Sequence, residues 1–227
     1  MKELEAATKN FNSDNLLGIG RFGTVYKGVL VNREVVVKRF SRNSHEGKRD
    51  FIVEITTISN LHHRNLVKLL GWCHERDELL LVYKFMPNKS LNKFIFCNQN
   101  HGAETNPVTL NWERRHGVIY GVTQALDYLH NGCEKRVLHR DIKPSNVMLF
   151  SEFNARLGDF GLARTINPSD QTHHSTKAIA GTPGYMAPES FLIGRATVQT
   201  DVYAFGVLVL GSYLWKKAWK TKHAEQL

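Results

Sequence analysis

Two short segments of this chain carry the residue types best suited to chemistry. Residues 139–146 read His-Arg-Asp-Ile-Lys-Pro-Ser-Asn, and residues 159–161 read Asp-Phe-Gly. Asp141 could act as a base toward a hydroxyl group, and Lys143 could neutralise charge on a phosphoryl group during its transfer. Asn146 and Asp159 supply the oxygen ligands that Mg²⁺ prefers. The segments therefore predict phosphoryl transfer, with Asp141 and Lys143 as catalytic residues and Asn146 and Asp159 as metal ligands.

A glycine-rich segment lies near the start of the chain and consists of Gly18, Ile19, Gly20, Arg21, Phe22 and Gly23. In a dinucleotide-binding protein, a helix would follow such a segment directly. Here residues 25–30 continue as a strand, which predicts a hairpin whose glycine-rich tip could close over nucleotide phosphates. An isolated match is equally compatible with an ordinary turn, and the downstream motifs favour nucleotide binding for these six residues.

Lys38 ends a run of three valines, where a strand could present its ammonium group to the α- and β-phosphates of a nucleotide. Glu54 lies in a segment with helical spacing and is flanked by apolar residues, so an inward-facing carboxylate there needs a counter-ion. We expect the two side chains to form an ion pair in the nucleotide site. The alternative is that both are surface charges.

Apolar periodicity predicts the elements that position these residues. Alternation over residues 16–40 predicts antiparallel strands, helical spacing over 48–61 predicts a helix, and residues 66–72 and 79–85 read as strands. Short helices are expected over 3–11 and 91–96, and the polar segment 98–109 is expected to be a loop. A long helix should follow Asn111 as its N-cap. The apolar stripe of that helix would comprise Val118, Ile119, Val122, Ala125, Leu126 and Leu129.

The composition is that of an ordinary globular protein, with 42% hydrophobic and 22% charged residues among 227. A formal charge of +9 could indicate nucleic acid, but the basic residues are scattered among acidic ones, and we expect no nucleic-acid partner. Cys73, Cys97 and Cys133 lack the spacing of a zinc site and are expected to be reduced thiols. No apolar signal segment or span is found, so the chain as given is expected to be cytoplasmic.

The eleven histidines could suggest a metal site. His62, His63, His173 and His174 have no acidic or cysteine partners at ligand spacing, and we expect them to be solvated. His139 is expected to pack against Phe160 as part of the core.

Arg140, beside the proposed base, is expected to be a buried cation that an added phosphate could neutralise. The segment between Phe160 and Ala187 offers three hydroxyl groups for this purpose, those of Thr172, Ser175 and Thr176. We hypothesise that phosphorylation of this segment activates the protein.

The order of these motifs, with Ala187-Pro188-Glu189 downstream, resembles that of protein kinases. The chain is most similar to the cytoplasmic kinase domain of plant receptor-like kinases with L-type lectin domains. This resemblance covers residues 4–210 and also rests on residues 6–11, 65–73, 81–91 and 181–189. It implies an α+β fold with two lobes: a small antiparallel-sheet N-lobe with one main helix, and a mostly helical C-lobe.

The resemblance also implies domain boundaries and ligands. We expect an N-terminal flanking segment over 1–15, the N-lobe over 16–86, a partial C-lobe over 87–210 and a divergent basic tail over 211–227. The expected substrates are ATP, used with Mg²⁺, and a protein with Ser or Thr acceptors, because Lys143 fits the Ser/Thr kinase pattern. A parent receptor would stand at the plasma membrane. Apart from such a receptor, we expect membrane association only through the basic tail, and only weakly.

Further site residues are implied by the resemblance alone. Tyr83 would stand at the back of the adenine pocket, and the backbone of residues 84–86, with Phe85 and Met86, would form the hinge that binds adenine. Val25, Val36 and Met148 would enclose the adenine ring. Thr182 would contact the protein substrate. Asp201 would accept backbone N–H bonds from the catalytic loop, residues 139–146, and could at the same time cap the following helix.

The sequence departs from the family pattern after Leu210, where we expect a truncated C-lobe. Glu189 would then lack its usual arginine partner, and apolar faces would lose their cover. Trp215 and Trp219 have helical spacing among lysines, so the tail could dock on the exposed core or lie on an acidic membrane, or have no function. The alternative to an active kinase is therefore a catalytically weak or inactive ATP-binding interaction module.

Overall fold

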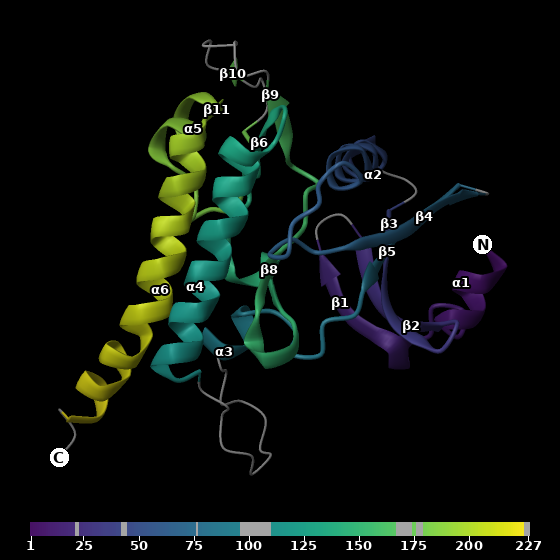
Figure 1. Ribbon diagram of the computed structural model, residues 1–227, viewed down its shortest axis with the longest axis horizontal. Coiled ribbons are helices and arrows are strands. Elements are labelled where there is room, and N and C mark those ends of the chain that lie inside the picture. Colours follow the sequence, from purple (N-terminus) through teal and green to yellow (C-terminus); the bar gives the residue numbers. More distant parts are fainter. Residues whose placement is uncertain are drawn as a thin grey trace.

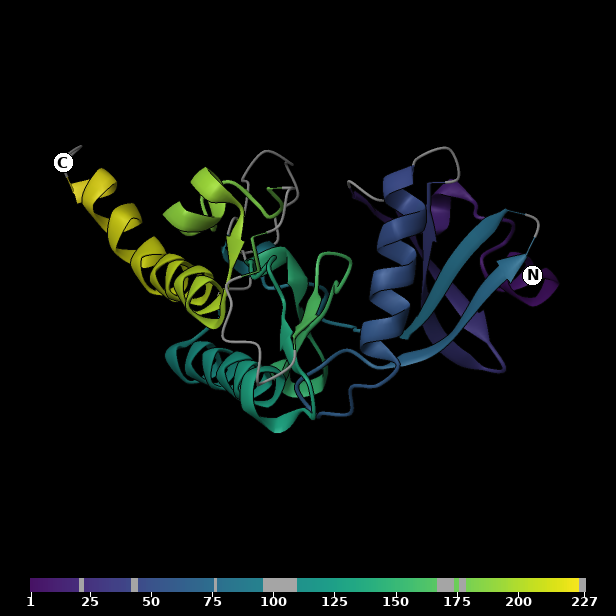
Figure 2. The same cartoon turned by 90° about the horizontal axis from the view of Figure 1, so that it is seen from above.

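The structure is a computed structural model that describes residues 1–20, 23–41, 45–75, 77–95, 110–166, 174–175 and 179–224. Side chains are described up to residue 213, except those of residues 174 and 175. The described residues form two lobes, with a sheet on one side and the longer helices on the other (Figure 2). This arrangement confirms the expected α+β fold.

The N-lobe contains a five-stranded antiparallel sheet in the order β1-β2-β3-β5-β4 (Figure 1). Its strands are β1 (Leu16–Gly20), β2 (Gly23–Leu30), β3 (Arg33–Phe40), β4 (Leu69–Glu75) and β5 (Glu78–Lys84). All residues of β5 except Lys84 are buried, because helices cover both faces of the sheet. Gly23 is required at the start of β2, since a Cβ atom there would lie 2.0 Å from the Arg39 carbonyl oxygen.

Helix α2 (His45–Ile58) covers one face of this sheet, where Phe51 and Ile58 pack with Phe40, Leu79 and Leu81. Its position links the sheet to the rest of the core, because the same apolar cluster continues into the C-lobe. The expected helix therefore exists but begins and ends three residues earlier than the predicted range 48–61.

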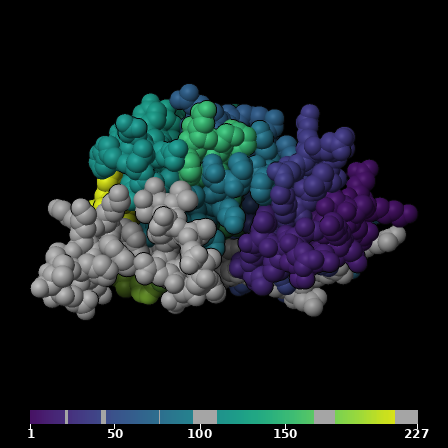
Figure 3. Space-filling view, turned by 90° about the horizontal axis from the view of Figure 1, so that it is seen from below, coloured from purple at the N-terminus to yellow at the C-terminus, as the bar shows by residue number. Residues whose placement is uncertain are grey.

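Helix α1 (Lys2–Ala7) covers the opposite face, and Leu4 is buried there with Val35, Val37, Leu80 and Val82. The segment expected only to flank the N-lobe therefore packs onto it, and its residues form one continuous surface with the following strands (Figure 3). The helix ends at Ala7 and not at residue 11, because residues 9, 10 and 11 take positive φ angles of 51°, 56° and 55°.

The C-lobe contains α3 (Asn92–Ile95), α4 (Trp112–Asp127), a π-helical turn (Tyr128–Gly132), α5 (Pro188–Ile193) and α6 (Val198–Ala224). Three pairs of short strands accompany them. These are β6 (Arg136–Leu138) with β9 (Arg164–Ile166), β7 (Val147–Leu149) with β8 (Ala155–Leu157), and β10 (His174–Ser175) with β11 (Arg195–Ala196). Short 3₁₀ turns occur at Ser13–Asn15, Pro144–Asn146 and Ser151–Phe153.

The N-terminus of α4 confirms the cap that the sequence predicts, since the Asn111 side chain accepts a hydrogen bond of 3.0 Å from the Arg114 backbone N–H. The predicted apolar stripe is buried except for Ile119, which is half-buried. Two other predicted ranges differ from the structure. The strand expected over 66–72 is β4, which begins and ends three residues later. Leu66 forms only an isolated bridge with Leu157, and the helix expected over 91–96 is the short α3, while the loop expected over 98–109 lies outside the described residues.

Helix α6 runs through the boundary expected between residues 210 and 211 and continues to Ala224. Its middle is held against α4, because Arg115 donates a hydrogen bond of 3.0 Å to the Ser212 carbonyl and the Trp112 and Tyr213 rings lie 5.0 Å apart. The side chains of Trp215 and Trp219 lie outside the described part of the chain. Among the described helices, none combines the length and apolar character needed to cross a bilayer.

Candidate active site

A cleft of about 410 Å³ lies between the two lobes, and most of the predicted nucleotide-binding residues line it. The lining residues that the sequence predicts are Gly18, Ile19, Gly20, Gly23, Val25, Val36, Lys38, Glu54, Tyr83, Lys84, Met86, Lys143, Asn146, Met148 and Asp159. Arg21 and Phe22 lie outside the described residues. Phe85 does not line the cleft, because its ring instead lies beneath the Lys27 ammonium group, 4.6 Å from it.

Lys38 joins the two lobes at the back of the cleft. Its ammonium nitrogen lies 2.7 Å from Glu54 Oε2 on α2 and 2.7 Å from Asp159 Oδ1 in the segment before β9. The predicted pair with Glu54 is confirmed, and Asp159 joins it as a second carboxylate partner. On strand β3, Val37 is buried against the face of the sheet that α1 covers. Because side chains alternate along a strand, Lys38 points to the other face, into the cleft.

Charge pairing favours the ionised forms of Lys38 and Asp159 despite their burial, whereas burial raises the pKa of the Glu54 carboxyl. Burial alone would lower the pKa of the Lys38 ammonium, but the Asp159 and Glu54 carboxylates raise that pKa above its ordinary value. Burial opposes ionisation of Asp159, yet the Lys38 charge holds the pKa of its carboxyl below the ordinary value. Lys38 is therefore a fixed cation in the cleft and Asp159 a fixed anion.

Tyr83, expected at the back of the adenine pocket, lines the cleft and also contacts Glu54. Its hydroxyl donates a hydrogen bond of 2.6 Å to Glu54 Oε1, the oxygen that Lys38 does not use. Burial, together with the Glu54 charge, raises the pKa of Tyr83 well above its ordinary value, so the phenol remains a donor. Strand β5 thus fixes the carboxylate that α2 provides.

The carboxylate of the proposed base, Asp141, contacts three polar side chains. Lys143 Nζ lies 2.7 Å from Asp141 Oδ2, and the Thr182 hydroxyl donates to Asp141 Oδ1 at 2.5 Å. Asn146 Nδ2 donates to Asp141 Oδ2 at 3.0 Å and to the Asp141 carbonyl at 2.8 Å. Lys143 also donates to the Thr182 hydroxyl at 2.7 Å, so Thr182 lies beside the proposed base.

The catalytic loop takes its shape from Asp201 in the first turn of α6. Asp201 accepts backbone N–H bonds of 2.8 Å from both His139 and Arg140, as predicted. It also lies 2.9 Å from His130 Nε2, a contact that the sequence did not suggest. These bonds hold Arg140 at a positive φ of 69°, a conformation that a non-glycine residue adopts only when its surroundings fix it.

The second role expected for Asp201, as the cap of the following helix, is wrong. Helix α6 already begins at Val198, and Thr197 and Thr200 cap it by exchanging hydrogen bonds between side chain and backbone. The carboxylate of Asp201 is therefore left to bind the catalytic loop.

His139 is a core residue, as predicted. Its ring is fully buried and packs on the Phe160 ring at 4.9 Å. Its Nδ1 accepts the Asp141 backbone N–H at 3.3 Å, and its Nε2 donates to the Gly158 carbonyl at 3.0 Å. His63 differs from the solvated state expected for it, because it stacks on Tyr128 at 4.9 Å. No cluster of metal-ligating His, Cys, Asp or Glu side chains occurs in the described parts of the chain.

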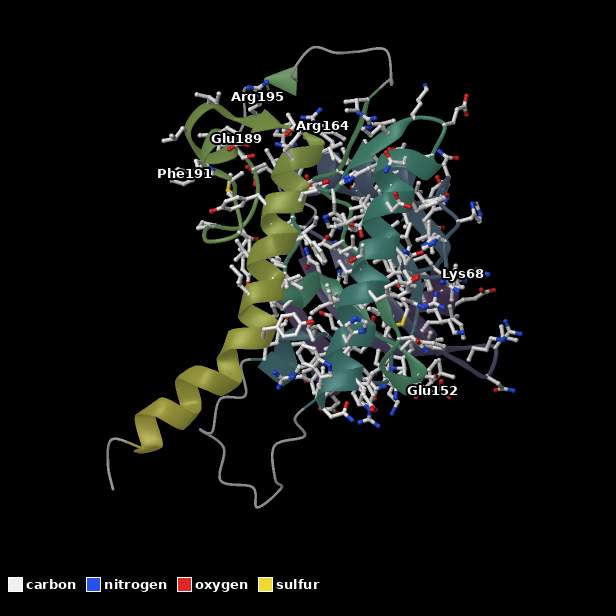
Figure 4. The ribbon with its side chains drawn as sticks, turned by 60° about the vertical axis from the view of Figure 1, so that its left-hand side comes forward. Lys68, Glu152, Arg164, Glu189, Phe191 and Arg195 are labelled. Carbon is white, nitrogen blue, oxygen red and sulfur yellow. The ribbon has the colours of Figure 1, made fainter. Side chains whose placement is uncertain are left out.

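Arg140 lies in a basic region next to the segment predicted to be phosphorylated. It donates a hydrogen bond of 3.3 Å to the Leu162 carbonyl, and burial, with the charges of Arg164 and Arg49, lowers its pKa to about 10. Figure 4 shows Arg164 and Arg195 near the same end of the C-lobe as Glu189. Thr172, Thr176 and the Ser175 side chain lie outside the described residues, although the Ser175 backbone pairs with that of Arg195.

The oxygen atoms in this cleft suit a magnesium nucleotide. Asn146 turns its amide nitrogen toward Asp141, and its Oδ1 accepts a long hydrogen bond of 3.5 Å from the Ser145 hydroxyl. Asp159 binds Lys38 through Oδ1. Such oxygen ligands fit a hard divalent cation. The apolar walls formed by Val25, Val36 and Met148 fit a planar base.

Three further lining residues were not predicted, namely Val67, Ser145 and Gly158. Ser145 and Gly158 each adjoin a predicted metal ligand in the sequence, which is a signal that could have included them. Val67 carries no such signal; its backbone N–H donates to the Leu157 carbonyl, and its side chain lies against Gly158. Cys73 and Cys133 are free thiols, as expected, and Cys97 lies outside the described residues.

These features define a protein kinase domain: residues 11–227 match the protein kinase domain family, and the chain belongs to that family. It is a plant receptor-like kinase domain. A relative from Arabidopsis thaliana named "Probable L-type lectin-domain containing receptor kinase S.5" is 63% identical over 217 residues, which cover 96% of this chain and 32% of the relative.

Two further Arabidopsis thaliana relatives carry related names. L-type lectin-domain containing receptor kinase VIII.1 is 50% identical over 92% of this chain and 28% of its own length, and receptor kinase IV.3 of the same group is 50% identical over 92% and 30%. The chain thus spans about a third of the length of the relatives it matches.

Proposed function

We propose that this chain transfers the γ-phosphoryl group of MgATP to Ser or Thr hydroxyls of a protein substrate. The main support for the proposal is that four residues lie together: Lys38, Asn146 and Asp159 line one cleft, and Asp141 is hydrogen-bonded to Asn146. A fixed cation, a hydrogen-bonded carboxylate and two oxygen ligands are the groups that phosphoryl transfer needs. One shared role in phosphoryl transfer explains the placement of all four residues, whereas a purely structural role would need a separate explanation for each.

In this mechanism, Asp141 orients the substrate hydroxyl and accepts its proton while the hydroxyl oxygen bonds to the γ-phosphorus and the bond to ADP breaks. Lys143 lies beside Asp141 and neutralises charge on the transferring group. Lys38 binds the α- and β-phosphates. When bound, Mg²⁺ would be held by Asn146 and Asp159 and would offset the charge of the phosphates.

Regulation by phosphorylation of the segment containing Thr172, Ser175 and Thr176 is part of the proposal. Its support is the concentration of positive charge around Arg140, which an added phosphate would offset. A variant in which alanine replaces all three residues should lose most of its activity. Full activity in that variant would show that the segment is not the regulatory site.

We also propose that this domain acts in the cytoplasm as part of a receptor at the plasma membrane. The support is the word "receptor" in the names of its relatives, of which this chain spans about a third. Ser/Thr specificity rests on Lys143 and Thr182, which lie together beside the base.

A second candidate is an ATP-binding interaction module with weak or no catalysis. It is favoured by the exposure of consecutive apolar residues on α5, where Phe191, Leu192 and Ile193 are 56%, 72% and 61% exposed. Figure 4 shows Phe191 pointing away from the rest of the lobe. Such a surface reduces the apolar burial that stabilises the lobe.

The two candidates are separated by incubating the purified chain with MgATP and a general protein substrate, and mapping phosphosites by mass spectrometry. A Lys38→Met variant is the control for contaminating kinases. Phosphate on Ser or Thr above this control supports the enzyme. No phosphate above the control, together with a melting temperature raised by the nucleotide, supports the binding module.

A further inference from the structure

A second cavity, of about 490 Å³, lies behind the nucleotide cleft, where α2 ends and the chain leads into β4. It shares only Val67 with the cleft. Its lining residues are Ile58, Ser59, Leu61, His62, His63, Arg64, Leu66, Val67, Lys68, Leu69, Leu70, Gly71 and Arg156. Its volume lies within the range of about 300–1,000 Å³ that ligand sites occupy, and the catalytic mechanism does not use it.

Permanent positive charge lines this cavity. Arg64, Lys68 and Arg156 contribute three cations, and none of the lining residues in the described part of the chain is acidic. His63 adds no charge at neutral pH, because burial and the nearby Arg64 lower its pKa and its Nδ1 accepts the Asn65 backbone N–H at 3.2 Å. The charge pattern therefore favours an anionic ligand.

Arg156 lies in β8 with part of its guanidinium group buried. Nη1 donates to the Leu66 carbonyl at 3.3 Å, and the group lies over the Phe150 ring at 5.0 Å. Its Nε atom is buried and has no hydrogen-bond partner among the described residues. A buried donor without an acceptor is unfavourable, so an anion that reached this guanidinium would offset part of its desolvation.

The surface beside the cavity is apolar and has a strand edge. Strand β4 forms one edge of the five-stranded sheet, as seen in Figure 1. Two of its large apolar side chains are exposed, Leu70 at 48% and Trp72 at 58%. An extended peptide can bind along such an edge through its backbone while its side chains enter neighbouring pockets.

We propose that this cavity binds an acidic peptide segment of a partner protein. A carboxylate or phosphoryl group of the peptide would lie against Lys68 and Arg156, and an aliphatic side chain would cover Leu70. Lys68 projects from the surface on this side of the molecule (Figure 4), so a partner can reach it. Ile58 lines the cavity and lies one helical turn after Glu54. An occupant would therefore contact α2, the helix whose Glu54 side chain pairs with Lys38.

The test is fluorescence anisotropy with short labelled peptides in which a phosphoserine or a glutamate stands between leucines, and a serine counterpart that lacks the charge. We expect the charged peptides to bind, the serine peptide to bind at least tenfold more weakly, and affinity to fall as salt rises. Lys68→Glu should weaken binding about tenfold. Arg33→Glu, a substitution of opposite charge at the exposed first residue of β3, should leave affinity unchanged.

Several results would overturn the proposal. These are equal binding of the serine peptide, equal loss in the Arg33→Glu variant, or binding to phosphatidylserine vesicles without binding of either charged peptide. An Asp141→Asn chain should bind the charged peptides with unchanged affinity, because Asp141 does not line the cavity and its side chain contacts Lys143, Asn146 and Thr182, none of which lies on α2. That result keeps the peptide site separate from the proposed catalytic function.

Discussion

Tyr83 and Lys38 hold opposite oxygens of the same carboxylate, that of Glu54. The Tyr83 hydroxyl donates to Oε1 at 2.6 Å and the Lys38 ammonium lies 2.7 Å from Oε2. Both oxygens of this buried acid are therefore satisfied from the sheet, one by β5 and one by β3. The position of α2 depends on both contacts.

A Tyr83→Phe substitution should destabilise the protein by about 1–3 kcal/mol, because it leaves a buried charged oxygen without its donor. Chemical denaturation measures the change. Tyr120→Phe, at a position that is 54% exposed, is the matched control and should change stability by less than about 0.5 kcal/mol. Equal small effects of the two substitutions would show that the Tyr83 contact contributes nothing.

Asp201→Asn should destabilise the protein by about 3–5 kcal/mol, the cost expected when a buried charge is removed from its hydrogen-bonded partners. The residue is 1% exposed and accepts bonds from the backbone of residues 139 and 140 and from His130. Thermal unfolding measures the loss. Asp127→Asn, at an exposed position near the end of α4, should cost less than about 1 kcal/mol. An Asp201→Asn variant that melts like the parent would contradict this role.

Thr182→Val should lower kcat for the protein substrate about tenfold to a hundredfold, because Thr182 positions Asp141 and Lys143. The KM for ATP should stay unchanged, since Thr182 does not line the nucleotide cleft. Thr182→Ser retains the hydroxyl and should restore most of the rate. Loss of ATP affinity in the valine variant, or no rescue by serine, would argue for a general structural defect.

Leu4→Ala should destabilise the N-lobe by about 2–5 kcal/mol, the usual cost of removing a buried leucine side chain. Leu4 is 8% exposed and packs on the outer face of the sheet, although it lies before the first residue of the family match. Leu17→Ala, at a position that is 44% exposed, is the control. If both variants unfold at the same denaturant concentration as the parent, α1 is not part of the folded unit.

The sequence was most informative where function constrains residue type and spacing. Asp141, Asn146, Asp159 and the Lys38–Glu54 pair follow from motifs whose chemistry leaves few alternatives, and the structure brings them together. The two-lobed fold was implied by the resemblance to protein kinases, while the strand and helix patterns predicted its individual elements.

The remaining contacts depend on packing between residues far apart in the sequence. The Tyr83 bond to Glu54 spans 29 positions, and no local pattern marks it. The burial of Leu4 required knowing which face of the sheet was open, and the contact of His130 with Asp201 joins residues 71 positions apart. Such relationships appear only once the tertiary structure is formed.

The most direct test of the central claim is calorimetric titration with a non-hydrolysable ATP analogue, with and without Mg²⁺. We expect tight binding that depends on Mg²⁺ in the parent chain, and an Asp159→Asn variant that binds weakly whether or not Mg²⁺ is present. Binding of equal strength in both proteins, indifferent to Mg²⁺, would contradict the claim that these side chains form a magnesium nucleotide site.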